Sequence, residues 1–98
     1  MEKIYEIIYQ AEVVSVDIEK LGAKEASDIQ RAINKKLVVH PEIFGVPLRE
    51  DLKGLRKLRV GNFRVIFSLQ GEKVLVFVIG HRSKVYKILK NRIKNAHY

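Results

Sequence analysis

The chain has 98 residues, 47% of them hydrophobic, and a formal net charge of +8; this predicts one globular domain over residues 1–98 and argues against a disordered chain. It has no cysteine, which excludes a disulfide framework and thiolate metal sites and fits a cytoplasmic protein. No apolar run approaches the length of a membrane span, and the N-terminal MEKIYEIIYQ carries an acid, so we expect neither a membrane segment nor a signal peptide.

The N-terminal residues predict a strand and then a segment that fits two patterns. Residues 3–9, KIYEIIY, are rich in β-branched and aromatic residues, which is typical of a strand. Residues 11–21 fit a strand, because Val14, Val16 and Ile18 alternate with polar residues. They also fit a helix that ends at Gly22, with an apolar stripe formed by Ala11, Val14, Ile18 and Leu21.

Residues 24–39 predict a helix. Their apolar side chains recur at helical spacing on one face, which comprises Ala26, Ile29, Ile33 and Leu37. We expect the helix to end at His40-Pro41, because a residue that precedes proline avoids the α-helical region. Residues 41–54 contain two glycines and two prolines and predict an irregular connection.

Three strands are expected next. Residues 55–60 and 63–69 are separated by Gly61-Asn62, a strong signal for a two-residue hairpin. Gln70-Gly71 then turns the chain into residues 74–79, which are apolar on both faces and should therefore lie inside the sheet. The sequence thus predicts a three-stranded antiparallel meander.

Residues 84–95 predict a basic amphipathic helix, since apolar residues at helical spacing are interleaved with lysine and arginine. The first half of the chain, residues 1–51, has a net charge of −3, with 7 Lys/Arg and 10 Asp/Glu. Residues 52–98 have a net charge of +11, with 12 Lys/Arg and the single acid Glu72. Such one-sided charge favours a polyanion or an acidic protein as partner, and a merely solubilising surface is the alternative.

Strand alternation gathers cations on one face of the meander. Lys57 and Arg59 share a face, while Leu58 and Val60 take the other, which suits a core. Arg64 is an unexpected cation in an otherwise apolar strand. It either meets a carboxylate or lines an open face, and the scarcity of acids in this half favours the open face.

The expected result is a cationic groove with one imidazole and one phenol. Its members are Lys57, Arg59 and Arg64 on the sheet face, His81 and Arg82 at the margin, and Tyr86 on the last helix. Such a set can hold phosphates by charge-assisted hydrogen bonds and offers a ring on which a base can stack. The three histidines show no metal-ligand spacing, so we expect no metal and no other cofactor.

The segments PLREDLKGLRKLRVGNFRVIF and VLVFVIGHRSKVY resemble the RelE/ParE toxins of type II toxin–antitoxin systems, and within them most closely the RelE-type mRNA interferases. The specific parts are LKGL, the VGNFRVIF hairpin and the IGHRxxVY ending, and the resemblance covers nearly the whole chain. It implies an α+β, RelE-like fold of order β-α-α-β-β-β-α, with an antiparallel sheet packed against a helical hairpin and a basic C-terminal helix. It also implies that residues 11–21 are helical.

The resemblance implies a catalytic role for each member of the groove. Lys57 and Arg59 match family cations that hold the RNA backbone and take part in proton transfer. Arg64 matches an arginine that steadies the scissile phosphate, and Tyr86 matches a tyrosine that stacks on a base.

Two residues are candidates for the role at the leaving group of the reaction. Arg82 is the match for the family arginine after the last strand, but His81 could take the acid–base role, as a histidine does in several relatives. The neighbouring cations expected to bind RNA are Lys53, Arg56, Lys84 and Lys87.

The expected function is that of a toxin that cleaves mRNA on the ribosome and so inhibits translation. It would be a metal-independent endoribonuclease that uses the 2′-hydroxyl of RNA as nucleophile, with a cognate antitoxin, the ribosome and mRNA as partners. A ParE-like toxin that poisons DNA gyrase without catalysis has the same fold and is one alternative. An inactive RelE-fold binding module is the other.

Overall fold

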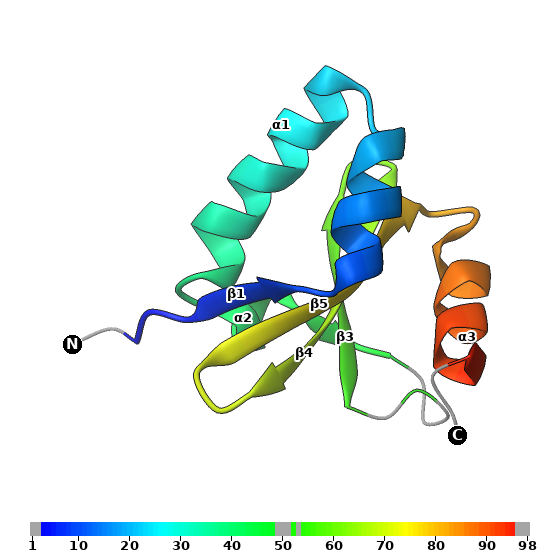
Figure 1. Ribbon diagram of the computed structural model, residues 1–98. Coiled ribbons are helices and arrows are strands. Elements are labelled where there is room, and N and C mark those ends of the chain that lie inside the picture. Colours follow the sequence, from blue (N-terminus) through cyan, green and yellow to red (C-terminus); the bar gives the residue numbers. More distant parts are fainter. Residues whose placement is uncertain (1–2, 49–51, 53, 96–98) are drawn as a thin grey trace.

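The computed structural model describes residues 3–48, 52 and 54–95. A five-stranded sheet lies between two helical segments on one face and a C-terminal helix on the other (Figure 1). The strand order is β1-β5-β4-β3-β2. The strands are β1 (Glu6–Tyr9), β2 (Val46–Pro47), β3 (Leu55–Val60), β4 (Phe63–Gln70) and β5 (Lys73–His81).

The strands β3, β4 and β5 form the predicted antiparallel meander. The turn at Gly61 has a φ of +58°, which glycine adopts without steric cost. β5 is flanked by β4 and by β1, in agreement with its apolar sequence. Because β1 runs parallel to β5, the complete sheet is mixed rather than antiparallel throughout.

The connection predicted to be irregular contains two elements. The preceding helical segment ends at Leu37, two residues before the predicted end at residue 39, and Pro41 begins the short helix α2 (Pro41–Phe44), since proline suits the first helical position. The two residues of β2 then pair with β3 and form the edge of the sheet. The prediction of irregular structure was wrong for these residues, and residues 49–51 and 53 lie outside the described part.

The first helical segment covers residues 11–20, one residue fewer than the helical range that the family resemblance implied, and includes the π-helical turn η1 (Val13–Asp17) and the 3₁₀ turn η2 (Ile18–Lys20). Its buried side chains are Val13 and Asp17. The predicted apolar stripe is wrong, because Val14 and Ile18 are exposed. The helix therefore uses a different face from the one that its apolar residues indicated.

The second helical segment consists of α1 (Ala23–Ala32) and the π-helical turn η3 (Ile33–Leu37). As predicted, Ile29, Ile33 and Leu37 are buried, and they form the main core with Val13 and one face of the sheet. Sheet residues of this core are Leu58, Val65, Phe67, Val74, Val76 and Ile79. We call this the hairpin face of the sheet.

The other face of the sheet is covered by the C-terminal helix α3 (Val85–Asn95). Ile66 and Val78 of the sheet form a smaller core with Val85 and Leu89 of this helix. We call this side the α3 face.

A bulge in β5 changes which side chains reach each face. Ile66 pairs with Val78, whereas the next residue, Phe67, pairs with Val76, so Phe77 is an additional residue in β5. Val76 therefore faces the helical hairpin and Val78 faces α3. This bulge explains how one strand supplies apolar residues to both cores.

A buried ion pair joins α3 to the first helical segment. Arg92 Nη2 donates to Asp17 Oδ1 at 2.6 Å, and Nη1 donates to Asp17 Oδ2 at 2.8 Å and to the Phe77 carbonyl at 2.9 Å. Asp17 Oδ2 also accepts the Ile79 N–H at 2.8 Å. β1 pairs with β5 only as far as Val76. Asp17 and Arg92 therefore provide hydrogen-bond partners for the Ile79 N–H and the Phe77 carbonyl, which do not pair with β1. The hydrogen bond to Asp17 raises the pKa of Arg92.

The substitution Gly45→Ala tests the packing between β2 and the main core. A Cβ at Gly45 would collide with the ring of the fully buried Phe67 and would lie 2.9 Å from the Pro41 carbonyl oxygen. We expect a loss of about 1–3 kcal/mol in the free energy of unfolding, measured in urea. The control is Gly80→Ala, whose Cβ would meet Val85 at an ordinary 3.7 Å. An equal loss in both variants would contradict the packing argument.

Candidate RNA-binding site

Three of the predicted cations share the α3 face of the sheet. Lys57 pairs with Ile66, which packs against α3, and Arg59 pairs with Arg64 two residues further along β3. Cross-strand partners point to the same face, so the side-chain alternation predicted from the sequence is correct here. Arg59 is exposed and Lys57 is half-buried.

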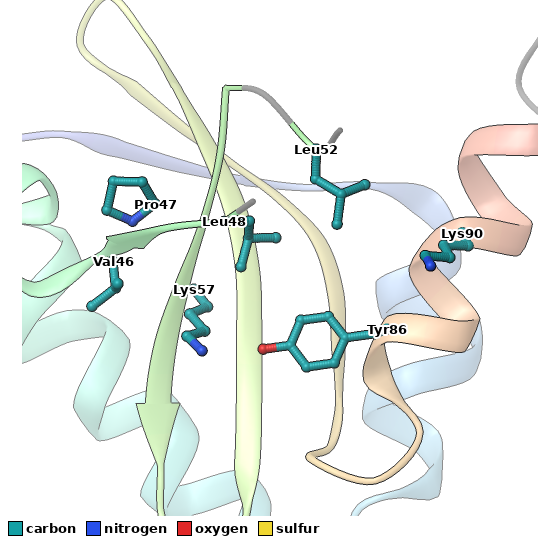
Figure 2. Close-up of a pocket in the computed structure, with 7 residues that line it drawn as sticks. All are labelled: Val46, Pro47, Leu48, Leu52, Lys57, Tyr86 and Lys90. Carbon is teal, nitrogen blue, oxygen red and sulfur yellow. The ribbon is translucent and has the colours of Figure 1, made fainter. Parts of the chain in front are cut away.

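A pocket of about 460 Å³ opens between β2, β3 and α3. Lys57 and Tyr86 point toward one another across it, and the Lys57 ammonium lies 6.0 Å from the centroid of the Tyr86 ring (Figure 2). This distance is that of a cation–π contact, which holds the ring and the ammonium on the same side of the sheet. We call this cavity the β2 pocket; it is lined by Val46, Pro47, Leu48, Leu52, Lys57, Tyr86 and Lys90.

Arg64 is only 8% exposed. Its Nη1 donates to the carbonyls of Gly61 at 3.0 Å and Phe63 at 2.8 Å, so the side chain ties down the turn between β3 and β4. The expectation that Arg64 lines an open face is wrong, since it is buried and backbone carbonyls are its partners. Its guanidinium still adds fixed positive charge below the α3 face.

His81 does not lie with Lys57 and Tyr86. It pairs with Phe63, which belongs to the hairpin face, and the two rings are in edge contact with centroids 5.6 Å apart. Its Nδ1 accepts the N–H of Ser83 at 3.1 Å and lies 2.8 Å from the Ser83 hydroxyl. In the neutral ring the proton is therefore on Nε2. The structure thus brings His81 to the margin of the sheet but on the side opposite to the pocket.

The remaining predicted residues lie in different parts of the structure. Arg82 is exposed and follows β5, where its N–H donates to the Asn62 carbonyl at 2.8 Å, beside the turn that Arg64 anchors. Arg56 pairs with Phe67 of the hairpin face, and its Nη1 donates to the Gly45 carbonyl at 2.8 Å, which is a structural contact. Predicted cations on or near α3 are the exposed Lys84 and Lys87, while Lys53 lies outside the described residues.

Sequence reasoning missed the apolar wall of the β2 pocket and one of its cations. Val46, Pro47 and Leu48 belong to the segment that was predicted to be irregular. Lys90 is one helical turn after Tyr86, and this i,i+4 spacing was the signal that could have identified it.

The described residues form neither a metal-binding cluster nor a membrane-spanning helix. Within residues 3–48, 52 and 54–95, no group of three or more His, Cys, Asp or Glu side chains is placed to hold a metal ion. Among the described helices, none is both long and apolar enough to cross a membrane.

Comparison with known proteins identifies toxins as relatives of this chain. Residues 15–86 match the family described as ParE toxin of type II toxin-antitoxin system, parDE. A curated relative, Toxin RelE of Mycobacterium tuberculosis (strain ATCC 25618 / H37Rv), is 31% identical over 74 residues, which are 74% of this chain and 76% of that protein.

Solved structures share the fold. The RelBE2 toxin-antitoxin complex from M. tuberculosis contains a chain with a TM-score of 0.74 at 23% identity, covering 85% of this chain and 99% of that one. The chromosomal ParDE system from P. aeruginosa gives a TM-score of 0.58 at 18% identity, over 81% and 97% of the two chains. The RelB-RelE complex from Methanococcus jannaschii gives 0.57 at 14% identity, over 81% and 94%. At these identities the structures support the α+β fold that the sequence predicted.

Proposed function

Because the chain belongs to the RelE/ParE superfamily of type II toxin–antitoxin toxins, we propose that it is a ribosome-dependent mRNA endonuclease that inhibits translation in the cytoplasm. The observation that carries this proposal is the approach of Lys57 to Tyr86 on the face that also holds Arg59 and Arg64. This arrangement offers a base a ring for stacking and offers an RNA backbone the cations Lys57 and Arg59, while the buried Arg64 adds positive charge beneath them. The curated relative named Toxin RelE favours the same activity.

The proposed reaction uses the nucleophile that RNA already carries. The 2′-oxygen attacks the neighbouring phosphorus, the bond from phosphorus to the 5′-oxygen breaks, and a proton passes from the 2′-hydroxyl to a base while the 5′-oxygen gains one. Lys57 can transfer a proton, whereas the exposed guanidinium of Arg59 suits the phosphoryl oxygens and the buried Arg64 adds positive charge beneath them. Tyr86 would hold the base by stacking, and the ribosome would supply the orientation of the message.

We assign the role of stabilising the leaving 5′-oxygen to Arg82 rather than to His81. Arg82 follows β5 beside the turn that Arg64 anchors, whereas the His81 ring packs on Phe63 of the hairpin face. A guanidinium cannot donate its proton readily, so Arg82 would stabilise charge on the 5′-oxygen and the proton would come from Lys57 or from water. Lys84 and Lys87 would contact the RNA backbone outside the pocket.

Analysis of the RNA ends tests the reaction. We expect the toxin-dependent cuts on programmed ribosomes to leave a 2′,3′-cyclic phosphate or 3′-phosphate and a 5′-hydroxyl, and a message with 2′-deoxyribose at the cut site to resist cleavage. End-group analysis suits this purpose because ribosomes need magnesium, which makes a chelator uninformative. A 5′-phosphate at these cuts, or equal cleavage of the deoxy-substituted message, would rule out the mechanism.

A second function is favoured by the match of residues 15–86 to the ParE toxins. In that case the chain would poison DNA gyrase by binding and would need no catalytic cluster. Growth arrest with unchanged RNA ends, together with inhibition of gyrase supercoiling by the purified chain, would identify this alternative. Neither effect, with antitoxin binding retained, would indicate an inactive binding module.

A further inference from the structure

The guanidinium of Arg64 is engaged by the backbone of the turn between β3 and β4. Nη1 has two hydrogens, and it donates to the Gly61 carbonyl at 3.0 Å and to the Phe63 carbonyl at 2.8 Å. The partner of Arg64 in β5 is Gly80, over which the first turn of α3 packs, since a Cβ at Gly80 would lie 3.7 Å from Val85. The side chain of Arg64 is therefore covered by the fold, and little of it is open to a phosphate.

The carbonyl between these two acceptors holds Arg82. The turn presents three consecutive carbonyls, and Arg64 binds the first and the third, those of Gly61 and Phe63. The second, that of Asn62, accepts the Arg82 N–H at 2.8 Å. Among the described residues, no hydrogen bond or ion pair holds the exposed side chain of Arg82, so its placement depends on its backbone. The turn thus connects the buried arginine to the exposed one.

We propose that Arg64 is a positioning residue for the cleavage reaction: it fixes the turn between β3 and β4, and the Asn62 carbonyl of that turn fixes the backbone from which Arg82 reaches the leaving 5′-oxygen. This role rests on the proposed nuclease function, and Arg64 acts through Arg82 rather than by contact with a phosphate. Displacement of a catalytic group by about 1 Å can lower a rate about 10²-fold, so a loosened turn would impair cleavage although Arg82 itself is unchanged.

A double-mutant cycle on programmed ribosomes distinguishes the two roles. If Arg64 acts through Arg82, its loss costs little once the Arg82 guanidinium is absent. We expect Arg82→Ala and Arg64→Met each to lower the single-turnover rate about 10-fold or more, and the double variant to cleave within about 3-fold of Arg82→Ala alone. The effects of Arg64→Met and Lys57→Met should multiply, because Lys57 has a separate role. Effects of Arg64→Met and Arg82→Ala that multiply would give Arg64 an independent contact and overturn the proposal.

Hydrogen exchange in the free protein measures the positioning without RNA. We expect Arg64→Met to speed exchange of the Arg82 N–H about 10-fold or more, because that amide loses a fixed acceptor. The control amide is that of Ile79, which donates to Asp17 at 2.8 Å, and its exchange should change less than about 3-fold. An unchanged Arg82 amide, or equal acceleration of both amides, would overturn the proposal.

Two glycines test the turn without removing a charge. Gly61 in this turn and Gly71 in the turn between β4 and β5 have φ angles of +58° and +62°, and a Cβ at either position would meet no atom within 4 Å. Alanine therefore strains the two backbones in a similar way. We expect Gly61→Ala to speed exchange of the Arg82 N–H and to lower cleavage about 10-fold or more, and Gly71→Ala to change cleavage less than about 3-fold. Equal losses of cleavage in the two variants would contradict a role for this turn.

Circular dichroism checks that each variant is folded. If the unaltered chain cleaves and the effects of Arg64→Met and Arg82→Ala multiply, the nuclease function stands and only the positioning role fails. If the unaltered chain cuts no message on ribosomes, the proposed function fails and the role of Arg64 in cleavage fails with it, whatever the exchange rate of the Arg82 amide.

Discussion

Asp17→Ala is expected to lower the free energy of unfolding by about 3–5 kcal/mol. The substitution leaves the guanidinium of Arg92, whose side chain is only 16% exposed, with only the longer ion pair to the exposed Glu12, 3.6 Å from Nε. It also removes the acceptor for the Ile79 N–H at the point where β1 no longer pairs with β5. Urea unfolding followed by circular dichroism measures the loss, which is a large fraction of the stability of a small domain.

A matched control separates this ion pair from ordinary surface charge. Asp28 of α1 also pairs with cations, Lys24 at 3.0 Å and Arg31 at 3.3 Å, but these side chains are exposed. We therefore expect Asp28→Ala to leave the free energy of unfolding nearly unchanged, because solvent screens exposed ion pairs. The double variant Asp17→Leu/Arg92→Met should recover much of the loss, because it leaves no buried unpaired charge, and Glu12, the other partner of Arg92, is exposed. Equal losses at Asp17 and Asp28 would contradict the role of burial.

The first helical segment illustrates what local sequence can predict. Apolar periodicity predicts that Val14 and Ile18 lie on the buried face of this segment, but Val13 and Asp17 are buried instead. An aspartate is buried here because Arg92 neutralises it, and Arg92 lies 75 residues later in the chain. No local pattern encodes such a long-range partner, so the helix could be assigned only through the family resemblance and its buried face could not.

The meander was predictable because its signals are local. The Gly61-Asn62 turn fixes the pairing of β3 with β4, and alternation then puts Lys57 and Arg59 on one face. The bulge at Phe77 was not predictable. If the pairing of Phe67 with Val76 continued without a bulge, Arg64 would pair with Ile79, and His81 would share the face of Arg64. One inserted residue therefore moves His81 to the hairpin face.

The wall of the β2 pocket shows the same limit. β2 has only two residues and includes a proline, so it carries no strand periodicity of its own. It exists because it pairs with β3 and because Arg56 binds the Gly45 carbonyl next to it. The cations of the site could thus be assigned from alternation, whereas the apolar surface beside them depends on tertiary contacts.

Lys57→Met is expected to reduce cleavage of mRNA on programmed ribosomes about 10²–10³-fold. Methionine keeps most of the aliphatic stem beside Tyr86 and the β2 pocket but removes the ammonium that we assign to proton transfer. No hydrogen bond of the described residues involves the Lys57 ammonium, so the free energy of unfolding should change by less than about 1 kcal/mol. The rate is measured in single turnover from the accumulation of cut message, with urea unfolding as the check on stability.

Lys73→Met is the control, because it removes one exposed lysine from β5 at the far end from α3 and lowers the net charge equally. We expect it to cleave at nearly the rate of the unaltered chain. A similar fall in both variants would mean that Lys57 acts only through the overall field, since long-range attraction depends on net charge. Full cleavage by a folded Lys57→Met variant would show that the Lys57 ammonium beside Tyr86 takes no part in the reaction. A different result would favour the gyrase-directed alternative. In that case neither the unaltered chain nor Lys57→Met would cleave mRNA on ribosomes, and Lys57→Met would still arrest growth, because binding to gyrase requires no proton transfer by Lys57.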